Sequence, residues 1–309
     1  MLRRVFALGM MALVLFLAPG IVHAEPISVS SGVKVTGMAP DASRRVYWVS
    51  DAAGGEVQAI SASGETLGKV TYKTKTASVQ ALSLSRGSLW VGDFAPGENL
   101  RLIQLNSLAY GPTTTQVWQL ALPAGADAAR ALMVSPKGNV YIATDGSKPG
   151  IYRASSPLKP RAVNKLTRVA DAPAGVTDGA FLSDGNSIAL RTNEQVIVMD
   201  AFRWTTTASA YMTPQPEGQA ISLSLDGGSL LLADGPNLVS MPIPTGIDSN
   251  RPTPQPTPSS SAEPSPGSPE PTASPVESSE KPSLAGTYTA LGIALGVSLL
   301  AGLVVAIKR

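Results

Sequence analysis

A pattern of apolar strands that recurs five times along the chain constrains its fold more than any other feature. In the clearest copy, strands are expected at Val79–Leu84, Leu89–Asp93 and Leu100–Leu105, with a tight turn at Arg86-Gly87. The first strands of the five copies contain Thr36, Gln80, Arg130, Asp178 and Gln219, at intervals of 44, 50, 48 and 41 residues. This spacing is close to the ~40–50 residues of a four-stranded propeller blade, so the pattern predicts a β-propeller.

Turns and outer strands complete the expected copies. Glycine-containing turns between first and second strands are expected at Lys137-Gly138, Asp184-Gly185 and Asp226-Gly227, and fourth strands at Lys69–Tyr72, Gln116–Leu122, Ala162–Leu166 and Ser209–Met212. The fifth copy lacks a fourth strand because prolines begin at Pro242. We expect Ile27–Ser30 to take that place, which removes exposed sheet edges. The sequence therefore favours an all-β, five-bladed propeller, with a six-bladed ring or a β-sandwich as the alternative.

The N-terminal segment Met1–Ala24 has the features of a secretory signal peptide. Arg3 and Arg4 precede an apolar run from Val5 to Leu17, and small residues precede a cleavage site after Ala24. An uncleaved anchor is less favoured, because this run is shorter than the ~20 residues that a membrane span needs. The propeller domain is expected at residues 25–245.

The composition changes from residue 246 onward. Residues 246–283 are rich in Pro, Ser, Thr and Glu, which do not form a core, so we expect an extended stalk. Leu284–Ile307 carries no charge and is long enough to cross a membrane, and Lys308-Arg309 fits a cytoplasmic tail. We therefore expect a single-pass protein of the cell surface with its N-terminal domain outside. Leu284–Thr287 also resembles a sortase signal, but Tyr288 replaces the final glycine, so a retained anchor is favoured.

Composition excludes several classes of chemistry. The chain has no cysteine, and its one histidine, His23, lies in the predicted signal peptide. Histidine-dependent triads, thiolate nucleophiles and Cys/His zinc sites are therefore excluded from the mature domain. A net charge of +2, without a basic stripe interleaved with aromatics, argues against a nucleic-acid partner. Carboxylate chemistry remains, as paired acids or as a hard-metal site.

Polar and aromatic residues recur at the second strands. Asp51, Asp93 and Asp234 lie at the ends of these strands, where a carboxylate accepts hydrogen bonds from the following turn. We favour this structural role over binding of a metal or substrate. Aromatic residues within the same strands are Trp48, Trp90 and Tyr141. We expect them to pack between blades, and stacking on sugars is the second interpretation.

The first strands supply a candidate channel ring. Thr36, Gln80, Arg130, Asp178 and Gln219 are expected to face one another there. The ring holds one acid and one base, and this suits an internal ion pair of Asp178 with Arg130 better than a divalent cation. We therefore expect no metal site, no catalytic residue and no cofactor, with Ca²⁺ as the alternative.

Several segments resemble a family of exported bacterial, mainly actinobacterial, propellers of the esterase-like or phytase-like type. The resemblance covers roughly residues 33–244 and is carried by Trp90–Asp93, Val176–Phe181, Asp184-Gly185, Ile188–Thr192 and Pro214–Gly218. It implies a propeller fold with acids at several first-strand positions. Because Gln80, Arg130 and Gln219 stand at those positions, the resemblance favours the fold and weakens the case for an enzyme.

These observations favour a membrane-anchored binding or scaffold module that is not an enzyme, with a cell-envelope protein or glycan as partner. The alternative is a divalent-metal-dependent hydrolase of carboxylic esters or phosphoesters. It is motivated by the resemblance and by several acids. The candidate binding residues are Asp51, Asp93, Arg130, Asp178 and Glu217.

Overall fold

The computed structural model describes residues 26–96 and 100–250. This part of the chain contains 21 strands. It contains no helix, and hence none able to cross a membrane. The predicted signal peptide, most of the predicted stalk, the predicted span Leu284–Ile307 and the tail lie outside the described residues.

Successive strands form groups of four antiparallel strands. The first group is β2 (Gly37–Asp41), β3 (Val46–Ser50), β4 (Glu56–Ile60) and β5 (Thr66–Tyr72). The second is β6 (Val79–Ser85), β7 (Ser88–Asp93), β8 (Leu100–Leu105) and β10 (Thr115–Ala121). The third is β11 (Ala128–Val134), β12 (Val140–Asp145), β13 (Gly150–Ala154) and β14 (Val163–Asp171). The fourth is β15 (Val176–Phe181), β16 (Ser187–Thr192), β17 (Gln195–Asp200) and β18 (Thr206–Tyr211). The last is β19 (Gly218–Leu223), β20 (Ser229–Asp234), β21 (Asn237–Pro242) and the N-terminal β1 (Ile27–Ser28).

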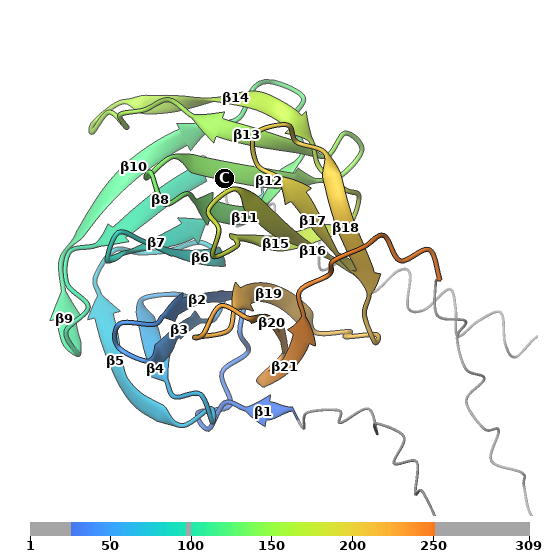
Figure 1. Ribbon diagram of the computed structural model, residues 1–309. Coiled ribbons are helices and arrows are strands. Elements are labelled where there is room, and N and C mark those ends of the chain that lie inside the picture. Colours follow the sequence, from blue (N-terminus) through green and yellow to red (C-terminus); the bar gives the residue numbers. More distant parts are fainter. Residues whose placement is uncertain (1–25, 97–99, 251–309) are drawn as a thin grey trace, which may run out of the picture. The chain divides into compact units, whose positions relative to one another are not determined.

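The first strand of each group lies innermost. β2, β6, β11, β15 and β19 contact one another in cyclic order, and β19 contacts β2 again. The other strands of each group follow outward from this centre (Figure 1). The domain is therefore an all-β propeller, as the repeated strand pattern predicts.

An N-terminal strand completes the last group, as the sequence predicts. β1 pairs antiparallel with β21, with Ile27 opposite Leu238 and Ser28 opposite Asn237. Val29 follows β1, is buried, and donates its N–H to the Pro236 carbonyl at 2.9 Å. The first and last segments of the domain thereby close the ring together.

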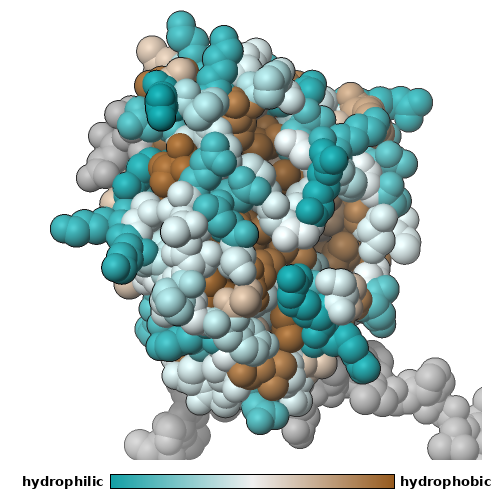
Figure 2. Space-filling view, turned by 90° about the vertical axis from the view of Figure 1, so that its left-hand side faces the viewer, coloured by the Kyte–Doolittle hydropathy of each residue, from teal (hydrophilic) through white to brown (hydrophobic). Residues whose placement is uncertain are grey.

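The outer strands are connected in a way that the sequence pattern does not reveal. A short strand, β9 (Gly111–Thr113), pairs parallel with β5, and β10 pairs parallel with β14. The second pairing joins two neighbouring groups into one eight-stranded sheet. Figure 2 shows the side of the molecule that carries β5, β9 and β10, where apolar patches lie between projecting hydrophilic side chains.

The last described residues run beside β18. Ser209 donates its N–H to the Gly246 carbonyl at 2.9 Å, and its carbonyl accepts the Asp248 N–H at 3.0 Å. Ile247 forms a parallel bridge with Ser209. Contacts with the propeller therefore extend past residue 245, the expected end of the domain.

Apolar residues between neighbouring groups form the core. Trp48 of β3 is fully buried and packs in one cluster with Val79, Leu82 and Leu89 of the next group. Its indole N–H donates to the Asp41 carboxylate at 3.2 Å, so its polar atom is satisfied. The predicted packing role of this tryptophan is confirmed.

Candidate functional site

One end of the channel carries a pocket that gathers several of the sequence candidates. The loops before the first strands and after the second strands meet at this end, because those strands are antiparallel. The pocket has a volume of about 620 Å³. Its polar lining residues are Lys34, Thr36, Asp51, Glu217 and Gln219. We call it the channel-mouth pocket.

An ion pair lies at the channel-mouth pocket. The Lys34 ammonium is 3.3 Å from Glu217 Oε1, and both side chains are more than half exposed. Asp234 accepts the Glu217 N–H at 2.9 Å, which fixes the backbone of that residue. Gly235 lies against Oε2, the second carboxylate oxygen of Glu217. A Cβ added at Gly235 would come within 2.6 Å of this oxygen, so the site leaves no room for a larger residue there. Sequence reasoning missed Lys34, because nothing in the strand pattern distinguishes it.

Asp51 and Asp93 both accept hydrogen bonds from backbone N–H groups. Asp51 Oδ1 accepts the N–H groups of Ala53 and Gly54, both at 3.1 Å. Asp93 is buried away from the pocket, accepts the N–H groups of Ala77 and Ser78, and forms an ion pair with Arg101. Asp51 therefore has the predicted role, because its donors lie in the turn that follows β3. Asp93 does not, because its donors lie in the segment that precedes β6. Of these two residues, only Asp51 lines the channel-mouth pocket.

Asp145, like Asp93, binds a backbone segment that precedes a first strand, and it was missed. It ends β12 and accepts the Gly175 N–H at 2.7 Å. From the sequence, this second strand is expected only at Val140–Ala143, which ends two residues early. A strand continued to residue 145 reveals the same strand-end aspartate as in the second and last groups.

β-bulges change which residues face the channel. The pairing of first and second strands shifts around Gln80, Arg130 and Thr177, each of which is the extra residue of its strand. Thr177 therefore occupies the place expected for Asp178. Its hydroxyl donates to the Gln219 carbonyl at 2.9 Å, as the Thr36 hydroxyl does to the Val79 carbonyl. The predicted ring is thus corrected at one position.

Asp178 is instead fully buried between β15 and β19. Its carboxylate accepts the Ile221 N–H at 3.1 Å, and burial raises the pKa of Asp178 well above its ordinary value. The nearby Arg191 guanidinium opposes this rise. Arg130 forms no ion pair within residues 26–96 and 100–250. The predicted pair of Asp178 with Arg130 is therefore wrong, and Arg191 supplies the charge.

Arg191 is the most deeply buried cation of the described chain, with 1% of its surface exposed. Its guanidinium donates to the carbonyls of Ala220 at 2.8 Å and Ala233 at 2.6 Å, and to the Gln215 side chain. Burial lowers the pKa of Arg191 to about 10, which leaves it charged at neutral pH. From the sequence, Arg191 is expected only to end a second strand at Ile188–Arg191, although an arginine in such an apolar strand is an unusual core residue.

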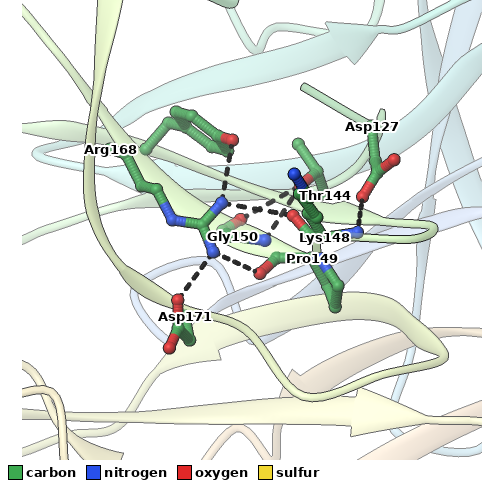
Figure 3. A network of polar contacts seen from close by, with 8 residues as sticks. Asp127, Thr144, Lys148, Pro149, Gly150, Arg168 and Asp171 are labelled. Atoms are coloured by element: carbon green, nitrogen blue, oxygen red, sulfur yellow. Dashed lines mark hydrogen bonds and ion pairs between the residues drawn. The ribbon is translucent and has the colours of Figure 1, made fainter. Parts of the chain in front are cut away.

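A polar network fixes the loop after β12 at the same end of the channel (Figure 3). Arg168 donates to the carbonyls of Lys148 at 3.2 Å and Pro149 at 2.8 Å and pairs with Asp171 at 2.6 Å. From the other side, Asp127 accepts the Lys148 N–H at 2.5 Å. The loop is therefore held from β14 and from the segment before β11.

The channel-mouth pocket does not suit a divalent cation. Within the part of the chain that the structure describes, no group of three acidic or histidine side chains comes together. Asp51 Oδ1 is occupied by turn amides, and Glu217 Oε1 by an ammonium. Ca²⁺ takes about six to eight oxygen ligands. The oxygen ligands of this pocket are therefore too few for Ca²⁺.

No protein-family model and no curated protein matches the chain. Among solved structures, it is similar to a gluconolactonase from Xanthomonas campestris, with 14% identity over 71% of this chain and 89% of that one, and a TM-score of 0.47. A periplasmic gluconolactonase from Pseudomonas aeruginosa is 19% identical over 67% and 68% of the two chains, with a TM-score of 0.42. The PQQ-bound aldose sugar dehydrogenase of Streptomyces coelicolor is 9% identical over 71% and 96%, with a TM-score of 0.44.

These comparisons correct three expectations. The propellers that the chain resembles are enzymes by name, so the expectations of a non-catalytic scaffold and of a non-enzyme are contradicted. The bound PQQ of the dehydrogenase contradicts the expectation that no cofactor is used. At these identities the likeness describes the fold, and any reaction has to be argued from the residues of this chain.

Proposed function

We propose that the chain is an ester hydrolase and that the channel-mouth pocket is its active site. The observation that carries this proposal is the ion pair of Glu217 with Lys34 in a pocket of about 620 Å³. This volume lies within the ~300–1,000 Å³ range of small-molecule sites. A carboxylate and an ammonium in one pocket supply the two functions that ester hydrolysis needs, a base and a stabiliser of negative charge.

In the proposed reaction, Glu217 takes a proton from a water molecule as that water attacks the ester carbonyl carbon. The Lys34 ammonium stabilises the negative charge that develops on the carbonyl oxygen. The bond from carbon to the leaving oxygen then breaks, and Glu217 returns the proton to that oxygen. The Gln219 amide, in the same pocket, is placed to hold the substrate by hydrogen bonds.

Replacing Glu217 by glutamine tests this role. We expect kcat to fall by about 10²–10⁴-fold, because glutamine keeps the shape but accepts no proton. The measurement uses the purified full chain with a p-nitrophenyl carboxylic ester and a sugar lactone. Glu65→Gln, an exposed acid outside the pocket, is the control and should keep wild-type activity. Absence of turnover of both substrates by wild type, or full activity of Glu217→Gln, refutes the proposal.

We further propose that the propeller has five blades. The cyclic contacts of the five first strands support this number, as does the completion of the last group by β1. The parallel pairing of β10 with β14 would then connect two adjacent blades at their outer edges.

We also propose that the domain is exported and held at the cell surface by residues 284–307, through the stalk at 246–283. The apolar run and the two terminal cations support this topology. Fractionated cells should retain the protein in the membrane, with the propeller cleaved by external protease. Recovery only from wall material after muralytic digestion would favour sortase processing at Leu284–Thr287 instead.

A further inference from the structure

A second pocket lies between the second and third strand groups, on the hairpin side of the propeller. It has a volume of about 530 Å³ and is lined by turns that connect first to second strands, by β7, β8 and β10, and by the segment after β13. Its principal polar and aromatic lining residues are Arg86, Trp90, Gln104, Trp118, Lys137 and Ser156. We call it the hairpin-side groove. It shares no residue with the channel-mouth pocket.

Two tryptophans form an aromatic wall of the groove. The rings of Trp90 and Trp118 lie 5.2 Å apart with an angle of 39° between their planes. Gln104 pairs with Trp90 across neighbouring strands, so an amide lies beside the wall. Trp118 is buried, whereas Trp90 remains half-buried and lines the groove. Aromatic rings with adjacent hydrogen-bonding groups suit a ligand that has both apolar faces and hydroxyls.

The groove carries uncompensated positive charge. Arg86 and Lys137 both line it, and no Asp or Glu does. Neither cation has a hydrogen bond or an ion pair from its side chain within the described residues. The turns that carry them are adjacent, since a Cβ on Gly138 would lie 3.8 Å from the Arg86 guanidinium. Two cations beside an aromatic wall favour an anionic ligand.

A second space shares one cation with the groove. Lys137 also lines this space of about 280 Å³, together with Tyr141, Phe181 and Phe202 and with one acid, Asp184, whose carboxylate accepts hydrogen bonds from its own turn. Phe202 is 66% exposed, and the rings of Tyr141 and Phe181 lie 5.8 Å apart. Lys137 therefore lines two spaces that both contain aromatic residues. This arrangement fits a chain of several rings better than a single small molecule.

From these observations we propose that the hairpin-side groove binds an acidic oligosaccharide, a chain of sugar rings that carry carboxylates. The sugar rings stack on Trp90 and on the aromatic residues beyond Lys137, and the carboxylates pair with Arg86 and Lys137. Single-stranded nucleic acid also combines rings and negative charge, but it is bound in grooves whose positive charge follows the backbone. Here only two cations line the groove, and the chain as a whole carries a net charge of only +2.

Binding is tested with the purified full chain and three probes: a tetragalacturonate, a neutral tetrasaccharide and a single-stranded oligonucleotide. Calorimetric titration should show binding of the uronate, at least tenfold weaker binding of the neutral sugar, and weakening of uronate binding by salt. The double variant Arg86→Gln, Lys137→Gln should weaken uronate binding at least tenfold. Lys75→Gln, an exposed cation in the loop before β6, is the control and should bind as wild type.

Two further variants complete the test. Trp90→Phe keeps an aromatic ring in the packed strand and should weaken binding less than Trp90→Ala does. Glu217→Gln should bind the uronate as wild type does, so this inference and the hydrolase proposal fail separately. Wild-type chain that binds no uronate at millimolar concentration overturns the inference. So does equal binding of the neutral sugar, tighter binding of the oligonucleotide, or unchanged affinity of the Arg86 and Lys137 double variant.

Discussion

Replacement of Arg191 by methionine is expected to lower the free energy of unfolding by about 2–6 kcal/mol, because two buried carbonyls lose their donor and each unpaired buried acceptor costs about 1–3 kcal/mol. The guanidinium supplies donors to the Ala220 and Ala233 carbonyls. Methionine fills similar space but leaves these acceptors unpaired, and leaves Asp178 without a nearby cation. Denaturant unfolding of the full chain measures the loss. Lys165→Met, at an exposed position of β14, should change stability by less than about 0.5 kcal/mol.

The dependence of this loss on pH separates charge from packing. The pKa of Asp178 is higher in the folded than in the unfolded chain, so folding binds a proton in the window above the ordinary value of 3.8. Its contribution to stability therefore falls as pH rises through that window, by at most about 1.4 kcal/mol per pH unit. Loss of Arg191 extends the window upward, so the loss should be larger at pH 8 than at pH 5. Asp178→Asn in the Arg191→Met background should recover part of it at pH 8. Equal losses at both pH values would contradict electrostatic coupling of the two residues.

Loss of the closing strand β1 is expected to have a comparable effect. Deletion of residues 26–31 removes the buried Val29 and several backbone hydrogen bonds, and exposes the edge of β21. Burial of a valine contributes about 1.5–3 kcal/mol and each hydrogen bond about 0.5–1.5 kcal/mol. We therefore expect a loss of about 3–6 kcal/mol in thermal or denaturant unfolding. An exposed edge also invites association, which size-exclusion chromatography detects.

A pair of glycine substitutions tests the contribution of β1 to stability without a deletion. Gly64 and Gly55 have φ of +84° and +80°, so alanine strains the backbone similarly at both positions. A Cβ at Gly64 would lie 2.2 Å from the Ser28 carbonyl oxygen, whereas one at Gly55 meets nothing within 4 Å. Gly64→Ala should therefore lose clearly more stability than Gly55→Ala. Equal losses, together with a truncated chain that is monomeric and as stable as wild type, would show that β1 does not close the ring.

The repeated strands were predictable because each group has to bury apolar residues against its neighbours. Apolar residues therefore recur in the sequence at regular intervals. The pairing of β1 with β21 was predictable from the missing fourth strand of the last group. The face on which Asp178 lies was not predictable, because the sequence pattern aligns Asp178 with Gln80 and Arg130, one residue too late. Thr177, and not Asp178, is the extra residue of the bulge, as Gln80 and Arg130 are in their strands. A shift by one residue turns a side chain to the opposite face, so the expected channel ring failed at this position.

The candidate site was predictable only in part. Asp51 and Glu217 were identified, and the ring closure that brings them to one pocket follows from the expected fold. Lys34 was missed because an exposed lysine before a strand has no pattern of its own. Arg191 was missed because its partners are carbonyls of β19 and β20, distant in sequence. Both omissions concern contacts between neighbouring strand groups, about which sequence periodicity carries no information.

Residues 246–248 lie along β18, so a pulling force on the C-terminal end of the domain would act first on β18. A force applied at residue 250 acts on the two hydrogen bonds of Ser209 with Gly246 and Asp248 before it acts on β21. These bonds act as a mechanical clamp, because the force has to break them before it peels β21 from β1. If the domain is tethered as proposed, drag from moving fluid would thus load the outer edge of the fourth group. The seam that closes the ring would be shielded from it.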